Sequence, residues 1–272
     1  MDLRVINRNY LKSKEPFGGK VIRLEDFTQL ASTPIPKPLI GGLALILGVV
    51  AYGLILLHRD PGAFRIWVSE DGLAEWLTFA VLMMMSVYSF VISKKFNQCS
   101  EARAAKRVWL FLGFLFLFGA MEEISWGQRI LGIQSPEWFL KHNRQGETNI
   151  HNLIVLGVNI NRLIFGKILA ILLTIYLLFV PLLYRRNERL RGFVNSWRIP
   201  VAQNYQTLLF IIVAIVIRLH LGLSKKADEL LELSGSYIIF LVLTHPFNQE
   251  IIPLRGLAVW MQRVFLRERK EA

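Results

Sequence analysis

This chain contains a series of long apolar runs that are almost free of charge, and these runs limit how it can fold. Each is about 18 to 22 residues long, enough for a helix to cross a hydrocarbon core of ~30 Å. Hydrophobic residues make up 53% of the sequence and charged residues 19%, against about 25% charged in soluble domains. With one cysteine, Cys99, no internal disulfide can form. The pattern excludes a soluble enzyme and predicts a polytopic membrane protein.

The apolar runs predict an all-α transmembrane bundle with six spans. Residues 1–35 are expected to form a cytoplasmic arm, 36–248 the six-span domain, and 249–272 a basic amphipathic helix on the membrane surface. Pro246 is expected to end the last span, because proline cannot continue a helix. The predicted spans are 38–57, 73–93, 108–121, 163–184, 205–223 and 229–247.

The basic residues predict which way the bundle faces. The segments on the side of the two termini hold 22 Lys and Arg, and the loops on the other side hold 9. Because basic loops stay in the cytoplasm, both termini are predicted to be cytoplasmic. This rule also explains the net charge of +12 without a nucleic-acid partner.

Polar and ionisable residues collect at the predicted outer ends of four spans. Acids at this depth are costly unless they pair, bind a cation or face water, so they indicate a functional site. Glu122 and Glu123 are adjacent and repel each other, which favours a bound proton or cation. If the third helix continues past them, Glu122, Ser125 and Arg129 share one face. The fourth span comes after His151 and Asn152, which are expected to open a helix.

These residues suggest three roles. Side chains that could act in acid–base or nucleophilic chemistry, bind an anionic headgroup, or hold a divalent metal such as zinc all occur at the same depth. The catalytic candidates are Glu122, Glu123 and Ser125; the substrate-binding candidates are Arg129, Arg218, Gln128 and Asn152; and the metal-ligand candidates are His151, His220, Glu232 and Glu75.

Structural explanations of the same residues stay open. Glu122 and Glu123 could be helix-end acids paired with arginine, and His151-Asn152 could be a helix cap. Arg218 and His220 could reach the lipid headgroups, where Trp126 and Trp138 in the long loop also fit.

Three stretches resemble signature sequences of a family of uncharacterised bacterial multi-pass inner-membrane proteins. They are Glu70-Asp71-Gly72-Leu73-Ala74-Glu75-Trp76, Glu122-Glu123-Ile124-Ser125-Trp126-Gly127-Gln128-Arg129, and Asn149-Ile150-His151-Asn152. The resemblance runs from about residue 40 to 247 and implies a bacterial inner-membrane location. There is also a loose similarity to alkaline ceramidase-like membrane hydrolases, which hold zinc with histidines, an acid and a serine.

The leading functional hypothesis is a metal-dependent membrane hydrolase or transferase that acts on a lipid or lipid-linked substrate. The metal would activate a water molecule and Glu123 would act as general base. An ion- or proton-coupled transporter and a non-catalytic scaffold subunit are the alternatives. The sequence contains no GxSxG, HExxH or phosphate-binding glycine loop.

Overall fold

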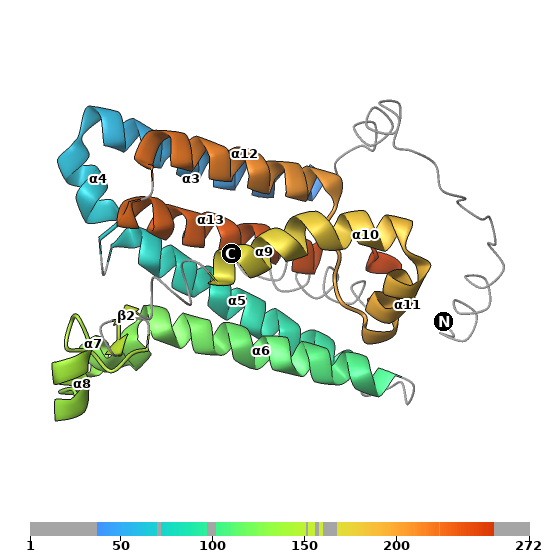
Figure 1. The fold of residues 1–272 in the computed structure, drawn as a ribbon, viewed down its shortest axis with the longest axis horizontal. Coiled ribbons are helices and arrows are strands. Elements are labelled where there is room, and N and C mark those ends of the chain that lie inside the picture. Colours follow the sequence, from blue (N-terminus) through green and yellow to red (C-terminus); the bar gives the residue numbers. More distant parts are fainter. Residues whose placement is uncertain are drawn as a thin grey trace, which may run out of the picture.

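The computed structural model describes residues 37–69, 72–96, 102–150, 152–155, 158–159, 168–222 and 224–252, and these are mostly helical. The predicted arm, nearly all of the predicted amphipathic helix, Cys99 and His151 lie outside the described residues. Figure 1 shows long helices packed side by side, with a small lobe at one end.

Five helices are long and apolar enough to cross a membrane. They are α3 (Lys37–Arg59), α5 (Leu73–Lys95), α6 (Arg103–Glu123), α12 (Asn204–Leu221), and the continuous segment Leu169–Arg186 formed by α9 (Leu169–Thr174), η5 (Ile175–Phe179) and α10 (Val180–Arg186). The remaining elements are α4 (Pro61–Trp67), η3 (Ser125–Gly127), α7 (Gln128–Leu131), α8 (Glu137–His142), β1 (Ile154–Val155), β2 (Val158–Asn159), α11 (Glu188–Trp197), α13 (Lys225–Thr244) and η6 (Gln249–Ile251).

The outer surfaces of the five long helices are apolar. Phe111 on α6 is 64% exposed, and Ile55 on α3 and Ile215 on α12 are more than half exposed. Contiguous apolar surface of this extent is costly in water but costs nothing in a hydrocarbon solvent. The five helices therefore have the surface as well as the length of membrane-embedded segments.

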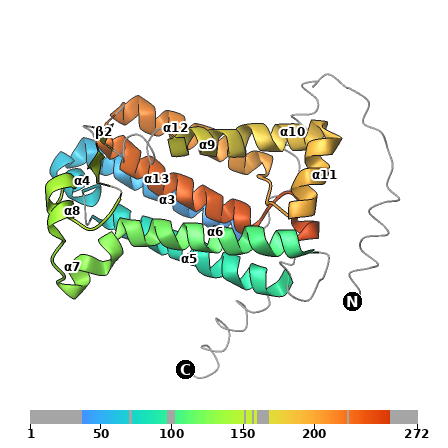
Figure 2. The ribbon, with the colours of Figure 1, turned by 60° about the horizontal axis from the view of Figure 1, so that its bottom comes forward.

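The predicted sixth span is α13, which packs against α5, α12 and α3. The predicted stop is confirmed, since α13 ends at Thr244, just before His245-Pro246. Its first turns carry Asp228, Glu229 and Glu232, and it is not among the five helices that are apolar enough to cross a membrane. Figures 1 and 2 show α13 beside α12 and among the other long helices of the bundle. Its Leu230, Ile238 and Val242 are fully buried.

The fourth predicted span contains a π-helical turn at Ile175–Phe179 that hydropathy alone does not reveal. Pro181 follows this turn and has no N–H to donate to the carbonyl of Leu177, four residues earlier. The hydroxyl of Thr207 on α12 donates to that carbonyl instead, at 2.7 Å. A backbone group without its helical partner is thus satisfied by a neighbouring helix, as a membrane interior requires.

Five helix termini lie at one end of the bundle: α3, α6 and α12 end there, and α5 and α13 begin there (Figure 1). We call this the Glu123 end. At the opposite end, buried Gln206 on α12 donates to the carbonyls of Leu241 and His245, at 3.0 and 3.1 Å. These bonds join the start of α12 to the end of α13.

Two glycines of α3 make a matched test of this packing. A Cβ on Gly53 would lie 2.6 Å from Cζ3 of Trp67, whereas a Cβ on Gly48 would meet no atom within 4 Å. We expect Gly53→Ala to lower the free energy of unfolding by about 1–3 kcal/mol through overpacking. Gly48→Ala should be neutral or stabilising, because alanine favours the helix by ~1 kcal/mol. Thermal unfolding in detergent measures both, and equal melting temperatures would contradict the packing.

Candidate functional site

A cluster of glutamates from three helices lies at the Glu123 end. Glu123 is the last residue of α6, and it is partly buried. Glu232, Glu229 and Glu75 are close enough to Glu123 to repel its negative charge, as is its neighbour Glu122. We call Glu75, Glu123, Glu229 and Glu232 the glutamate cluster.

Helix packing explains why these acids meet. α5 packs against both α6 and α13, and α6 runs opposite to α5 (Figure 1). The first turn of α5, the last turn of α6 and the first turns of α13 therefore share one end of the bundle. The structure brings together Glu75, Glu123 and Glu232, which were singled out separately in the sequence. Glu229 joins them, and it precedes Glu232 by three residues on the same helix, a spacing that places both on one face.

Glu122 is only 2% exposed and does not share the environment of Glu123. Its two carboxylate oxygens accept hydrogen bonds from the Trp126 indole Nε1 and the Ile150 backbone N–H, both at 2.7 Å. The side chains of adjacent helical residues point about 100° apart, so Glu122 and Glu123 face different neighbours. Glu122 thus holds the lobe, residues 124–150 and 152–155, against the end of α6.

The third helix does not continue past Glu123, so the predicted shared face of Glu122, Ser125 and Arg129 is not formed. Three consecutive residues have positive φ: Ser125 at 49°, Trp126 at 56° and Gly127 at 74°. This conformation costs a residue other than glycine about 1–2 kcal/mol. Sequence patterns miss the break because only one of the three residues is glycine.

Hydrogen bonds of buried polar side chains hold this turn. The Ser125 hydroxyl donates to Oε2 of Glu147 at 2.5 Å and accepts from Nδ2 of Asn149 at 2.8 Å. Asn143 Nδ2 in turn donates to Oδ1 of Asn149 at 2.8 Å. Ser125, Asn143 and Asn149 are all buried. The hydroxyl of Ser125, a catalytic candidate, is therefore part of the network that shapes the lobe.

Gln128 also bonds within the lobe. Its Oε1 accepts from the backbone N–H of Thr148 at 2.7 Å, and its Nε2 donates to the Ser135 hydroxyl at 2.6 Å. Arg129 follows Gln128 in α7.

The prediction that His151-Asn152 begins a helix is wrong, because Asn152 lies in a turn that leads into β1, and β1 pairs antiparallel with β2. The backbone N–H of Asn152 donates to Oδ1 of Asn149 at 3.1 Å, and its Nδ2 donates to Oε1 of Gln145 at 2.5 Å. Asparagine side chains commonly stabilise such turns as well as helix caps. The short hairpin is the one departure from the predicted all-α fold among the described residues.

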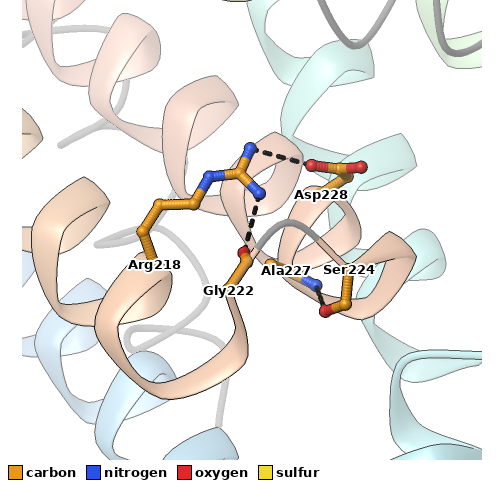
Figure 3. Close-up of polar contacts among 5 residues, drawn as sticks. All are labelled: Arg218, Gly222, Ser224, Ala227 and Asp228. Atoms are coloured by element: carbon orange, nitrogen blue, oxygen red, sulfur yellow. Dashed lines mark hydrogen bonds and ion pairs between the residues drawn. The ribbon is translucent and has the colours of Figure 1, made fainter.

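Arg218 closes the turn between α12 and α13 (Figure 3). Its Nη2 donates to Oδ1 of Asp228 at 2.8 Å, and its Nη1 donates to the Gly222 carbonyl at 3.1 Å. The Ser224 hydroxyl caps α13 by accepting from the Ala227 N–H at 3.2 Å. Arg218 therefore has a structural role beside any role in binding an anion.

The exposed ring of His220 packs against that of His58, with the ring centroids 5.6 Å apart and nearly perpendicular. Its Nδ1 lies 2.9 Å from the Val216 carbonyl oxygen. Within the described part of the chain, no group of three or more His, Cys, Asp or Glu side chains could hold a metal ion. Of the predicted metal ligands, Glu75 and Glu232 lie in the glutamate cluster, His220 lies beside His58, and His151 is outside the described residues.

No protein-family model, curated protein or solved structure matches this chain.

The bonds of Glu122 predict that Glu122→Gln loosens the lobe. Both carboxylate oxygens face N–H donors, and an amide can present an oxygen to only one of them. We expect the local opening free energy at Ile150 to fall by about 1–3 kcal/mol, measured by hydrogen exchange. Glu137→Gln is the control, since Glu137 is exposed and forms a 3.7 Å ion pair with Lys141. Unchanged exchange at Ile150 would mean that Glu122 does not hold the lobe.

Replacing Arg218 and Asp228 separates a structural role from anion binding. The two side chains are 35% and 41% exposed, so a double-mutant cycle should give a coupling energy of only about 0.2–1 kcal/mol. If Arg218 only closes the turn, Arg218→Ala and Asp228→Ala should lower stability by the same amount and should have the same effect on function. A loss of function with Arg218→Ala alone would instead indicate that the guanidinium binds an anionic substrate.

Proposed function

We propose that this chain is an integral protein of the bacterial inner membrane that acts as a hydrolase or transferase on a lipid or lipid-linked substrate. The observation that carries the proposal is the position of Glu123, which ends an apolar helix and faces the charges of Glu75, Glu229 and Glu232. The proposed active site is the glutamate cluster.

Electrostatics gives the cluster its chemistry. Several negative charges beside a membrane interior cannot all stay ionised without compensation, so the site favours a bound proton or a bound cation. A carboxylate that exchanges a proton readily can act as general acid or general base. Glu123 is the group we assign to proton transfer, because the charges of all three other members of the cluster repel its negative charge.

A divalent metal such as zinc is the second way to neutralise the cluster. The ligands we propose are Glu75, Glu232 and His151, with His220 joining them only if it leaves its contact with His58. Carboxylate oxygens also bind Mg²⁺ and Mn²⁺. Such a metal would supply an activated water as the nucleophile.

The orientation that we propose puts the Glu123 end at the outer face of the membrane and both termini in the cytoplasm. The excess of Lys and Arg on the side of the termini, 22 against 9, supports this orientation. The substrate would then enter from the outer leaflet.

An ion-coupled transporter is the second candidate, because two cluster members, Glu229 and Glu232, lie on α13, which packs against α5, α12 and α3. Beyond the cluster, however, α13 packs through buried apolar residues such as Ile238, Leu241 and Val242. The hydroxyl of buried Ser234 donates to the Leu230 carbonyl of its own helix, at 2.7 Å. This packing favours chemistry at one face over passage through the bundle.

The test compares Glu123→Gln with Glu137→Gln, which makes the same chemical change at an exposed site on α8. We expect Glu123→Gln to reproduce the lipid profile of a strain that lacks the protein, and Glu137→Gln to leave it as in the wild type. A wild-type lipid profile with Glu123→Gln would refute the proposed site.

Elemental analysis of the purified protein distinguishes a cluster that is neutralised by a bound proton from one that is neutralised by a bound metal ion. A near-stoichiometric metal that is lost in Glu75→Gln/Glu232→Gln would identify a metal-dependent enzyme. Proton- or cation-driven uptake into proteoliposomes that Glu123→Gln abolishes would favour the transporter instead.

A further inference from the structure

The lobe differs from a water-soluble domain in two ways: several polar side chains are buried inside it, and most of its large apolar side chains are exposed beside the charged side chains of Glu137, Lys141 and Arg144. Its buried polar residues bond mainly to one another, as described for Ser125, Asn143 and Asn149. The polar side chains that are buried in the lobe are Ser125, Ser135, Asn143, Asn149 and Asn152.

The outer surface of the lobe carries many large apolar side chains. Ile130 is 66% exposed and Leu131 is 68% exposed, values typical of charged side chains in a soluble protein. The large apolar residues exposed on the lobe are Trp126, Ile130, Leu131, Ile133, Trp138, Leu140, Ile150, Ile154 and Val155. A surface with so many exposed apolar side chains requires either a partner or a non-aqueous solvent.

The apolar surface of the lobe continues that of the membrane-spanning helix before it. Phe111, Phe114 and Phe118 are exposed on α6. The ring of Phe118 contacts the indole of Trp126, with centroids 5.9 Å apart and a nearly perpendicular arrangement. The lipid-facing side of α6 therefore passes into the lobe without a polar boundary at this contact.

We propose that the lobe inserts its apolar surface into the bilayer, at the boundary between lipid headgroups and acyl chains. Trp126 and Trp138 are exposed on it, and tryptophan is enriched at this depth. Exposed Lys141 and Arg144 supply cations for lipid phosphates. The hydrogen bonds of buried Ser125, Asn143 and Asn149 lie within the lobe, so these side chains need no water when the lobe enters a region poor in water.

The insertion is independent of the chemistry assigned to the glutamate cluster. It rests on the burial pattern of the lobe and on the Phe118–Trp126 contact. A second copy of the chain or another protein could also cover the apolar surface, and the experiment below separates these occupants from lipid.

The experiment places nitroxide spin labels on single cysteines in a Cys99→Ser chain reconstituted into phosphatidylcholine–phosphatidylglycerol vesicles. Labels at Leu131→Cys and Ile133→Cys probe the apolar surface of the lobe. Phe111→Cys, on the exposed face of α6, is the lipid-facing control, and Glu188→Cys, exposed on α11, is the water-facing control. Oxygen concentrates in the bilayer, whereas a water-soluble nickel chelate is excluded from it.

We expect both lobe labels to be relaxed more by oxygen than by the nickel chelate, like the Phe111 label and unlike the Glu188 label. Preferential relaxation by the chelate would place the surface in water and overturn the proposal. Protection from both reagents, or spin–spin broadening between labels, would show a protein partner or a second copy and would equally overturn it.

A second measurement uses the chain without labels. Lipids brominated near the headgroup should quench its tryptophan fluorescence, and Trp126→Phe/Trp138→Phe should reduce the quenched fraction. If the double variant leaves the quenched fraction unchanged, the two indoles do not contact lipid and the insertion is refuted.

Discussion

At the Glu123 end of the apolar bundle, the carboxylates of the glutamate cluster repel one another. The structure at this end must compensate that repulsion. Glu75, Glu123, Glu229 and Glu232 come from three helices that would be ordinary membrane segments without them. Concentrated negative charge beside a hydrocarbon core is unfavourable unless something compensates it. Among the described contacts, Arg218 bonds Asp228, the residue before Glu229. For the glutamate cluster, the compensation that we propose is a bound proton or a bound cation.

The lobe meets the same constraint in a different way. Its buried Ser125, Asn143 and Asn149 bond to one another or to Glu147, so the burial of these side chains needs no external ligand. This network holds Ser125 and Trp126 at positive φ. Two environments therefore lie side by side at the end of α6: one in which polar groups satisfy each other and one in which like charges face each other.

Hydropathy predicted the long helices well, because length and apolar content suffice to recognise a segment that spans a bilayer. Proline predicted the end of α13 at Thr244. The break after Glu123 was left open by the sequence, because it depends on hydrogen bonds between residues more than twenty positions apart, such as Ser125 with Glu147. The turn at Asn152 was mispredicted, because the asparagine side chains that bond there stabilise a turn as readily as a helix cap. Sequence spacing groups residues on one helix face, but it does not show that Glu122 and Glu123 have different partners.

The order of Glu122 and Glu123 in the chain has a mechanical consequence. One peptide unit joins a carboxylate that holds the lobe to a carboxylate that belongs to the glutamate cluster. Any tilt of the lobe relative to the bundle must therefore be absorbed in the last turn of α6, where Glu123 lies. Changes in leaflet thickness or lateral pressure would reach the charged site as a displacement of a single side chain.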